Sequence, residues 1–305
     1  MKLIKKKSCV EVTAVGGLGN QLFCYAAGLY LAEKTKTKLV INVSQIGVGS
    51  VDHGKTIINF DLDCEFRNSS HVGDVRSNFL LRLSRKLAFE FNWFRKLYEF
   101  CSGRYIAKSV GYESEFTKIL TPRDLSGYFQ TYIYADFVRS TLLKSVQLKR
   151  ESAWFQDKLS DLSRKNPIVI HMRRGDYLKA KSDFGVLNLN FYLEALDFLQ
   201  GKIVEREVWI FTDSPNIVYE EISNSGLRSA TIITPPIESS PNESMILMSR
   251  ASDLIISNST FSWWSAYLSN KETNVVAPNK WFRDLEDPKM LIPEHWHQVD
   301  SQWIE

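Results

Sequence analysis

A short apolar run in the middle of the chain ends in a dense set of charges. Residues 167–170 are followed at once by His171, Arg173, Arg174 and Asp176. Because an unpaired buried charge is strongly destabilising, we expect this cluster at the end of a strand, beside a ligand. Arginine suits a phosphate, since its planar guanidinium donates two parallel hydrogen bonds and stays charged.

The two adjacent arginines are expected to have different partners. Neighbouring residues of a strand point to opposite faces of the sheet. One arginine can therefore reach a ligand on the side of His171, while the other pairs with a carboxylate of the protein, for which Asp176 is a candidate. A structural ion-pair network is the alternative for the set, and for one of the two arginines we favour it.

A second polar run precedes an amphipathic segment nearer the C-terminus. It consists of Asn258, Ser259, Thr260, Phe261 and Ser262. Free amides and the helix dipole make a helix N-terminus favourable for an anion, although one such residue often only caps the helix. Four polar residues exceed what one cap needs, so the run favours an anion site. Together with an arginine at a strand end, it indicates a diphosphate.

A glycine-rich turn near the N-terminus reads GGLGNQ. Gly17 and Gly19 would let backbone amides approach a ligand, and Asn20 and Gln21 add polar side chains. The turn lacks the third glycine of a dinucleotide-binding fingerprint and the Gly-Lys-Ser/Thr of a phosphate-binding loop. Taken alone, it favours a tight turn.

The segment FTDSP supplies a fourth polar strand end. Ser214 is expected to cap the next helix, and Asp213 could cap it or bind a ligand. No Asp-x-Asp motif or cluster of His and Cys occurs at the expected strand ends, so the sequence does not indicate a metal-assisted site.

Alternating strands and helices must position these groups, and ligands bind at the carboxyl ends of parallel strands. We expect strands within residues 9–15, 38–43, 167–173, 207–215, 230–236, 253–260 and 274–281. We expect helices within residues 21–36, 79–100, 126–145, 188–200, 216–223, 242–252 and 261–269. Residues 47–74 lack periodicity and are expected to be loops.

This order predicts an α/β protein with two Rossmann-like domains facing a central cleft. We place the boundary in a polar, helix-like connector at residues 151–165, which leaves domains at 1–150 and 165–290 and a tail at 291–305.

Composition excludes several classes of function. A formal net charge of +3 over 305 residues does not favour nucleic-acid binding. The four cysteines show no CxxC spacing, which indicates reduced thiols. Without an apolar signal region or a run of ~18 apolar residues, a cytoplasmic protein is expected.

One stretch raises the possibility of membrane contact. It begins at Phe79, ends at Lys108, and combines many Lys and Arg with the pair Trp93 and Phe94. A helix packed on its own domain is the simpler interpretation, and peripheral contact with the inner membrane face is the alternative.

Four of these motifs together resemble a known family. The segments GGLGNQLFCYA, HMRRGDY, FTDSP and NSTFSWWSAYLS, in that order, are similar to the α-1,2-fucosyltransferases of glycosyltransferase family 11. The resemblance spans residues 15–282 and is specific, although Cys24 stands where the family often has Gln. The His-x-Arg-Arg-x-Asp core is shared with α-1,6- and protein O-fucosyltransferases, whereas GGLGNQ and FSWW favour the α-1,2 group.

The resemblance implies a GT-B fold and transfer of fucose from GDP-β-L-fucose, with inversion and without a metal. The implied acceptor is the 2-hydroxyl of a β-galactoside, in a galactose-terminated oligosaccharide or a lipid-linked glycan such as an O-antigen. The first domain would then lie on the acceptor side, and the second would bind GDP-fucose.

The resemblance also implies roles for single residues. Arg173 would bind the β-phosphate, His171 would contact the donor from the same face, and Asn20 would reach the donor from the first domain. Glu243 is a candidate for the guanine edge, since a carboxylate accepts both N1–H and the exocyclic amine. Asp176 is the one carboxylate of its motif and could be the catalytic base or orient Arg174. Further donor-binding candidates are Gly17, Gly19, Gln21, Asp213, Ser214, Asn258, Ser259, Thr260, Phe261 and Ser262.

Other activities fit the same residues less well. They are fucose transfer in another linkage, transfer from another GDP-sugar, and a nucleotide-sugar-binding or lectin-like protein without catalysis. The presence of His171, Arg173 and Asp176 argues against loss of catalysis.

Overall fold

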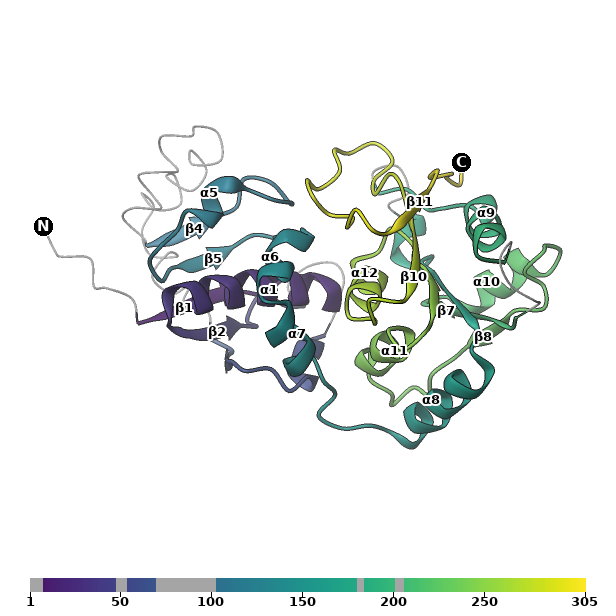
Figure 1. Cartoon of the computed structure of the whole chain (residues 1–305), viewed down its shortest axis with the longest axis horizontal. Helices are drawn as coiled ribbons and strands as arrows, with labels where there is room; N and C mark the ends of the chain where they lie inside the picture. Colours follow the sequence, from purple (N-terminus) through teal and green to yellow (C-terminus); the bar gives the residue numbers. More distant parts are fainter. Residues whose placement is uncertain (1–7, 48–53, 70–102, 180–183, 201–205) are drawn as a thin grey trace, which may run out of the picture. The chain divides into compact units, whose positions relative to one another are not determined.

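The computed structural model describes residues 8–47, 54–69, 103–179, 184–200 and 206–305. It divides into two compact units, each built on one parallel sheet (Figure 1). Unit 1 comprises Met1–Ile58 and Leu62–Ser145, and unit 2 comprises Asn59–Asp61 and Val146–Glu305. The two expected Rossmann-like α/β domains are confirmed, while the cleft expected between them stays a prediction.

Unit 1 has five strands in the order β3-β2-β1-β5-β4, all parallel. In β1, Val10 and Val12 are buried between partly exposed neighbours, as an alternating sequence requires. The strands are β1 (Cys9–Thr13), β2 (Lys38–Asn42), β3 (Glu65–Arg67), β4 (Arg104–Ile106) and β5 (Asp124–Ser126). The helices are α1 (Leu18–Thr35), η1 (Thr56–Asn59), α5 (Ser114–Thr117), α6 (Tyr132–Phe137) and α7 (Arg139–Ser145).

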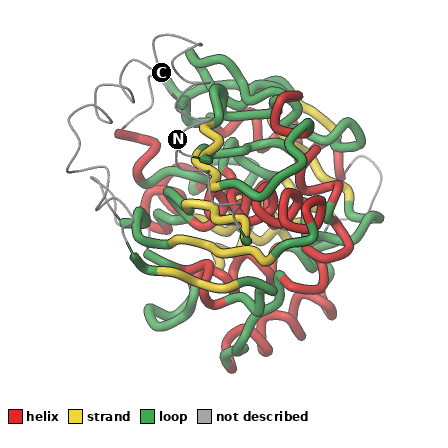
Figure 2. The backbone as a smooth tube through the Cα atoms, turned by 90° about the vertical axis from the view of Figure 1, so that its left-hand side faces the viewer, coloured by secondary structure: helices red, strands yellow, loops and turns green. Residues whose placement is uncertain are grey.

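Helix α1 lies close against the sheet of unit 1. Figure 2 shows the strands of this unit side by side, and α1 packs on β1 and β2. A Cβ on Gly28 would lie 2.8 Å from Leu39 Cδ1 and 3.0 Å from Val12 Cγ1, so glycine allows the close approach. The helix starts at Leu18, earlier than expected, because Gly17 already has the extended conformation of an N-cap.

Unit 2 has six parallel strands in the order β11-β10-β9-β6-β7-β8. The strands are β6 (Ile168–Met172), β7 (Val208–Thr212), β8 (Thr231–Ile233), β9 (Asp253–Ile255), β10 (Asn274–Pro278) and β11 (His297–Val299). The helices are α8 (Ala153–Lys165), η2 (Asp176–Lys179), α9 (Leu189–Gln200), α10 (Pro215–Ile222), α11 (Pro241–Met248) and α12 (Thr260–Tyr267).

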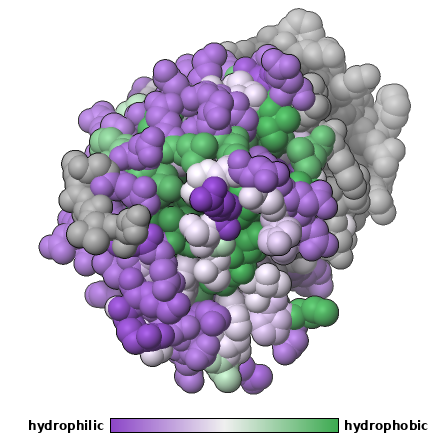
Figure 3. All heavy atoms as spheres, turned by 90° about the vertical axis from the view of Figure 1, so that its right-hand side faces the viewer, coloured by the Kyte–Doolittle hydropathy of each residue, from purple (hydrophilic) through white to green (hydrophobic). Residues whose placement is uncertain are grey.

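The core of unit 2 fixes which way the residues of β6 face. Ile168, Ile170 and Met172 pack in one cluster with the buried sides of α9 and α10. By strand alternation, His171 lies on the opposite face of the sheet. The outer face of the molecule beside α9 and α10 is mostly hydrophilic around a smaller exposed hydrophobic area (Figure 3).

Three expectations about organisation need correction or fall outside the described residues. The helix expected at residues 151–165 is present as α8, but it packs against α11 within unit 2, and the units divide between Ser145 and Val146. The expected tail contains β11, whose pairing with β10 could not be foreseen because only Val299 of its three residues is buried. Of the stretch from Phe79 to Lys108, residues 79–102 lie outside the described residues, and β4 occupies part of the rest.

Two findings concern the membrane and the thiols. Among the described helices, none is long and apolar enough to cross a membrane. Cys9, Cys24 and Cys64 are free thiols. Burial raises the pKa of Cys24 to about 12, and its Sγ lies 3.4 Å from the carbonyl oxygen of Gly127.

Candidate functional site

The strand order of unit 2 places its candidate site between β6 and β9. From β6 the chain continues through β7 and β8 on one side, and β9, β10 and β11 lie on the other. Such a reversal of strand order is a topological switch point, where open parallel sheets bind ligands at the carboxyl ends of their strands. The loops after β6 and β9 start at Arg173 and Ile256, so they carry the two motifs that the sequence singled out.

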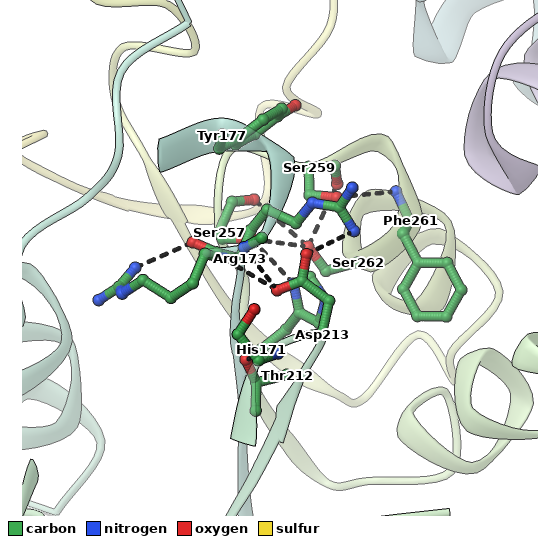
Figure 4. A network of polar contacts seen from close by, with 12 residues as sticks. His171, Arg173, Tyr177, Thr212, Asp213, Ser257, Ser259, Phe261 and Ser262 are labelled. Atoms are coloured by element: carbon green, nitrogen blue, oxygen red, sulfur yellow. Dashed lines mark hydrogen bonds and ion pairs between the residues drawn. The ribbon is translucent and has the colours of Figure 1, made fainter. Parts of the chain in front are cut away.

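Arg173 is the accessible cation at this switch point. Its side chain is 24% exposed, and its NH1 lies 3.1 Å from Oδ2 of Asp213. Its guanidinium carbon lies 5.4 Å from the centre of the Tyr177 ring, a distance at which cation–π attraction operates. In Figure 4 the guanidinium points toward Asp213, on the side of Ser259 and Phe261. A cation oriented in this way can donate hydrogen bonds to a phosphate oxygen.

Asp213 orients the loop that carries Arg173. Besides the ion pair, its Oδ1 accepts hydrogen bonds from the backbone amides of Arg174 (2.9 Å) and Gly175 (3.2 Å). We expected Asp213 to bind the donor or cap a helix; the structure instead uses its carboxylate to fix the loop after β6. Ser214, expected to cap α10, stands at the N-cap position but makes no capping bond with its side chain.

Glycine is required at position 175 because Asp213 lies so near. A Cβ added there would lie 2.5 Å from Oδ2 and 3.0 Å from Cγ of Asp213.

We expect Gly175→Ala to displace the Asp213 carboxylate and so to release Arg173. The affinity for GDP should fall about tenfold, and the free energy of unfolding should fall by about 1–3 kcal/mol. Isothermal titration with GDP measures the first effect, and Gly226→Ala, in unit 2 but beside Leu193, is the control. Equal affinities of the two variants would contradict the role of Asp213.

Arg174 is the structural arginine of the pair, and Glu221 is its partner. Its side chain is fully buried, and its Nε and NH2 donate to the two carboxylate oxygens of Glu221, each at 2.7 Å. NH1 donates to the carbonyl oxygen of Arg173 at 3.0 Å, which ties the pair to the loop. The candidate Asp176 opens η2, and its side chain lies outside the described part of the chain.

His171 is buried on the same face as the start of α12. Its Nδ1 lies 2.8 Å from Oγ of Ser257, and its ring lies 5.6 Å from that of Phe261. Burial lowers the pKa of His171 from 6.5 to about 3; the charge of Arg173 adds to this and that of Asp213 opposes it. His171 is therefore neutral at physiological pH.

The hydroxyl network around Ser257 favours one tautomer of His171. Ser262 Oγ donates to carbonyl oxygens 3.2–3.3 Å away, and it lies 3.5 Å from Ser257 Oγ. The distance from Ser257 Oγ to His171 Nδ1 is shorter, at 2.8 Å, than the distance to Ser262 Oγ. The hydroxyl of Ser257 therefore donates its hydrogen bond to Nδ1. Nε2 then carries the hydrogen, and His171 is a neutral donor that can bond an anionic oxygen.

A pH dependence of stability follows from the buried neutral His171. Between pH 6.5 and 3 the unfolded chain binds a proton at this imidazole and the folded chain does not, so folding becomes less favourable as pH falls. We expect the free energy of unfolding to decrease more steeply between pH 6.5 and about 4 in the wild type than in His171→Asn, which cannot titrate there. Urea unfolding across this range tests it, and parallel curves would refute it.

The polar run before α12 mostly serves the protein itself. Asn258 donates through Nδ2 to the carbonyl oxygens of Phe184, Gly185 and Trp281, at 3.0–3.1 Å. Ser259 caps the helix by accepting from the amide of Phe261, and Ser262 bonds to carbonyl oxygens of its own loop. Of the predicted anion site, Asn258, Ser259 and Ser262 bond to the protein itself, whereas partly exposed Thr260 and Phe261, with the backbone at the start of α12, are left for a ligand.

Glu243 also has a structural partner. Its buried carboxylate accepts from the amide (2.6 Å) and hydroxyl (3.1 Å) of Ser152, the N-cap of α8. The prediction that Glu243 reads guanine is not supported by this geometry. A residue that joins two helices is hard to recognise in a sequence, because the helix dipole alone already favours an acidic residue in the first turn of a helix.

In unit 1 the GGLGNQ turn leads from β1 into α1. Gly17 is the N-cap of α1, Gly19 is buried, and Gln21 bonds to the carbonyl oxygens of Gly16 and Gly54 and the amide of Ile57. Gln21 is thus a structural residue and not the ligand contact we expected. Asn20 is partly exposed, and its Oδ1 accepts from Gln130 at 2.9 Å.

Comparison with known proteins places the chain among glycosyltransferases. The model of the family "Glycosyl transferase family 11" matches residues 76–296, more than half of the chain. An alpha-1,2-colitosyltransferase of Escherichia coli is 27% identical over 96% of this chain and 100% of that protein. The O-antigen biosynthesis glycosyltransferase WbnK of Escherichia coli is 27% identical over 91% of this chain and 96% of that protein.

A mammalian relative and a solved structure extend the likeness. Galactoside alpha-(1,2)-fucosyltransferase 2 of Sus scrofa is 27% identical over 58% of this chain and 56% of that protein. The crystal structure of the NodZ alpha-1,6-fucosyltransferase soaked with GDP-fucose superposes with a TM-score of 0.51, covering 89% of this chain and 95% of that chain at 14% identity. This structural likeness supports a fold of the GT-B type.

Proposed function

The chain belongs to glycosyl transferase family 11, and from this premise we propose that it transfers L-fucose from GDP-β-L-fucose to the 2-hydroxyl of a terminal β-galactoside. The product would have an α-1,2 linkage, formed with inversion at the anomeric carbon. That the chain is a glycosyltransferase follows from the family; donor, acceptor and linkage are the proposal. Relatives named for α-1,2 transfer of fucose and colitose support the linkage.

The observation that carries the donor assignment is the position of Arg173. It is the accessible guanidinium at the switch point of unit 2, and Asp213 and Tyr177 hold it in one orientation. Two N–H groups along one edge of its planar guanidinium can donate to phosphate oxygens in parallel, which a lysine could not do. The loss of GDP places new negative charge on the β-phosphate, so a fixed cation there stabilises the transition state more than the bound donor.

His171 and the start of α12 would assist the same step. A neutral Nε2–H adds a hydrogen bond to a phosphate oxygen without adding a charge that burial would oppose. The amides at the start of α12 add the positive end of a helix dipole. We propose that these groups neutralise the leaving diphosphate without a metal. Among the described residues, no cluster of three or more His, Cys, Asp or Glu could hold one.

The acceptor is proposed to be a galactose-terminated oligosaccharide or lipid-linked glycan of O-antigen type. The WbnK relative, named for O-antigen biosynthesis, supports this class. Peripheral membrane contact through the stretch from Phe79 to Lys108 is a further part of the proposal, and most of that stretch lies outside the described residues.

A transfer assay tests the proposal. The protein is incubated with GDP-fucose and lactose, GDP release is followed, and the linkage of the product is determined by NMR. We expect GDP release that depends on lactose and a fucose attached to O2 of galactose. Fucose attached at any other position would defeat the linkage, and binding of GDP-fucose without transfer to any galactoside would favour the non-catalytic alternative.

Transfer of colitose is the second candidate. It is favoured by the colitosyltransferase relative, which matches over its full length at 27% identity. Competition decides between the two: equal amounts of GDP-fucose and GDP-colitose are offered with one galactoside, and the ratio of the two products gives the ratio of kcat/KM. We expect fucose to be preferred, and preference for colitose would replace the proposed donor.

A further inference from the structure

Unit 1 has a switch point of its own. In its sheet order β3-β2-β1-β5-β4, strands β2 and β3 lie on one side of β1, while β5 and β4 lie on the other (Figure 1). The reversal therefore falls between β1 and β5, where a parallel sheet of this kind binds ligands. β1 leads into the first turn of α1, which carries Asn20, and the loop after β5 comprises residues 127–131.

A hydrogen bond between side chains joins the first turn of α1 to the loop after β5. Gln130 is 6% exposed, and its Nε2 donates to Oδ1 of partly exposed Asn20 at 2.9 Å. The Gln130 Oε1 is buried, and in the described part of the chain it has no hydrogen-bond partner. Exchanging O and N of the amide would only move the unsatisfied atom to the nitrogen. A buried polar group without a partner is unfavourable, and such groups are concentrated at functional sites.

The loop after β5 is held in a conformation that a non-glycine residue rarely adopts. Phe129 has φ +55°, although its ring is buried. Gly127 lies so near Ala107 that a Cβ there would be 2.5 Å from the Ala107 Cβ, and the amide of Gln130 is fixed by the carbonyl oxygen of Val110 at 2.7 Å. Backbone strain of this kind persists where the surroundings enforce it and is frequent at ligand sites. Between these residues, Tyr128 leaves 44% of its surface exposed.

The chemistry of this set differs from that of the switch point in unit 2. Asn20 and Gln130 are neutral amides that offer both donors and acceptors, and no charged side chain among the described residues bonds to either. Such groups match the hydroxyls of a sugar, whereas a diphosphate needs cations. An exposed tyrosine provides a flat apolar face with a polar edge, which suits one face of a sugar ring.

We infer that Asn20 and Tyr128 form a binding site for the terminal sugar of the acceptor, with Gln130 as the residue that positions Asn20. This inference rests on the proposed function and assigns that function's galactoside to named residues of unit 1. Asn20, which the sequence analysis assigned to the donor, then contacts the acceptor.

Three variants test the site, with KM for lactose and the dissociation constant of GDP measured for each. In Asn20→Ala and Tyr128→Ala we expect KM for lactose to rise about tenfold while GDP binds with its wild-type affinity. Gln130→Met keeps the shape but not the amide, and its KM should rise in the same way, since Asn20 loses its fixed orientation. Tyr219→Ala, which removes an exposed tyrosine from unit 2, is the matched control and should leave both constants at wild-type values.

Direct binding keeps the test independent of turnover. Saturation-transfer NMR with methyl β-D-galactoside and lactose is recorded for the wild type and for Tyr128→Ala, a change at the surface that folding tolerates. The expected result is a signal in the wild type that is weakened in the variant. Wild-type constants in all three variants, or weaker donor binding in place of weaker acceptor binding, would overturn the inference while leaving the proposed function standing. If the wild type does not transfer fucose but binds the saccharides, and Tyr128→Ala weakens that binding, the proposed function fails and the saccharide site stands.

Discussion

Replacing Arg173 with alanine is expected to lower kcat for transfer by about two to three orders of magnitude, the size of effect seen when one fixed donor to a developing charge is removed. In its proposed role the side chain would meet the leaving phosphate as a charged, planar group, paired with Asp213 at 3.1 Å and with its guanidinium carbon 5.4 Å from the centre of the Tyr177 ring. Its contribution grows as the bond to fucose breaks, so kcat should fall more than the affinity for GDP-fucose. Steady-state kinetics with lactose as the acceptor measures both.

Charge and geometry can be separated at this position. Arg173→Lys keeps the charge but loses the planar fork and its stacking, so a loss of about tenfold to a hundredfold is expected, between the wild type and the alanine variant. Arg250→Ala removes an exposed arginine from the same unit and serves as the control. Because Arg173 is 24% exposed, its removal should leave the fold intact, which circular dichroism checks. Transfer at the wild-type rate by Arg173→Ala would remove the basis of the phosphate assignment.

The sequence allowed the strands of unit 2 to be predicted closely, because their apolar runs are bounded by polar turns. β6 and β7 therefore fell where expected, and with them the positions of Arg173 and Asp213 at strand ends. The short strands β3, β4, β5 and β11 were missed, since their sequences EFR, RYI, DLS and HQV do not form an apolar run of the kind that marked β8 and β9. The failure to predict β5 had the largest consequence, because the switch point of unit 1 lies between β1 and β5 and could not be located without it.

The partners of the site residues were much harder to predict than the residues themselves. Polar side chains were assigned to a ligand wherever they gathered, yet Gln21, Asn258 and Glu243 satisfy groups of their own protein. A buried turn leaves many amides and carbonyls that side chains must bond, and a sequence does not show which of them are buried. Ser257 gave no signal beyond being a small polar residue after a strand.

Glu221 illustrates what the sequence could still have offered. It lies 47 residues from Arg174, but in α10 it flanks the buried pair Val218 and Ile222. A carboxylate beside the apolar stripe of a helix, in the crossover that follows the neighbouring strand β7, is a candidate partner for a buried arginine. Proximity in sequence favoured Asp176 in our prediction, whereas the fold supplies the carboxylate from α10, the helix that follows β7.

Removing the carboxylate of Glu221 should strongly lower the stability of unit 2. Arg174 is fully buried, and two hydrogen bonds of 2.7 Å to Glu221 compensate its charge. In Glu221→Gln the guanidinium keeps its charge but loses its counter-ion, and an uncompensated buried charge costs about 3–5 kcal/mol. Glu220→Gln, an exposed neighbour on the same helix, should change the free energy of unfolding by less than about 0.5 kcal/mol. Urea unfolding of the two variants measures the contrast.

A double variant separates the charge from the fold of the loop. If the loss in Glu221→Gln comes from the unpaired cation, then removing the cation as well, in Arg174→Met with Glu221→Leu, should recover part of the stability. Transfer should not recover with it, because Arg174 also donates to the carbonyl oxygen of Arg173 at 3.0 Å and so sets the loop that presents the phosphate ligand. A double variant less stable than Glu221→Gln would mean that Arg174 stabilises the unit through packing on Tyr192, 5.6 Å away, more than through its charge.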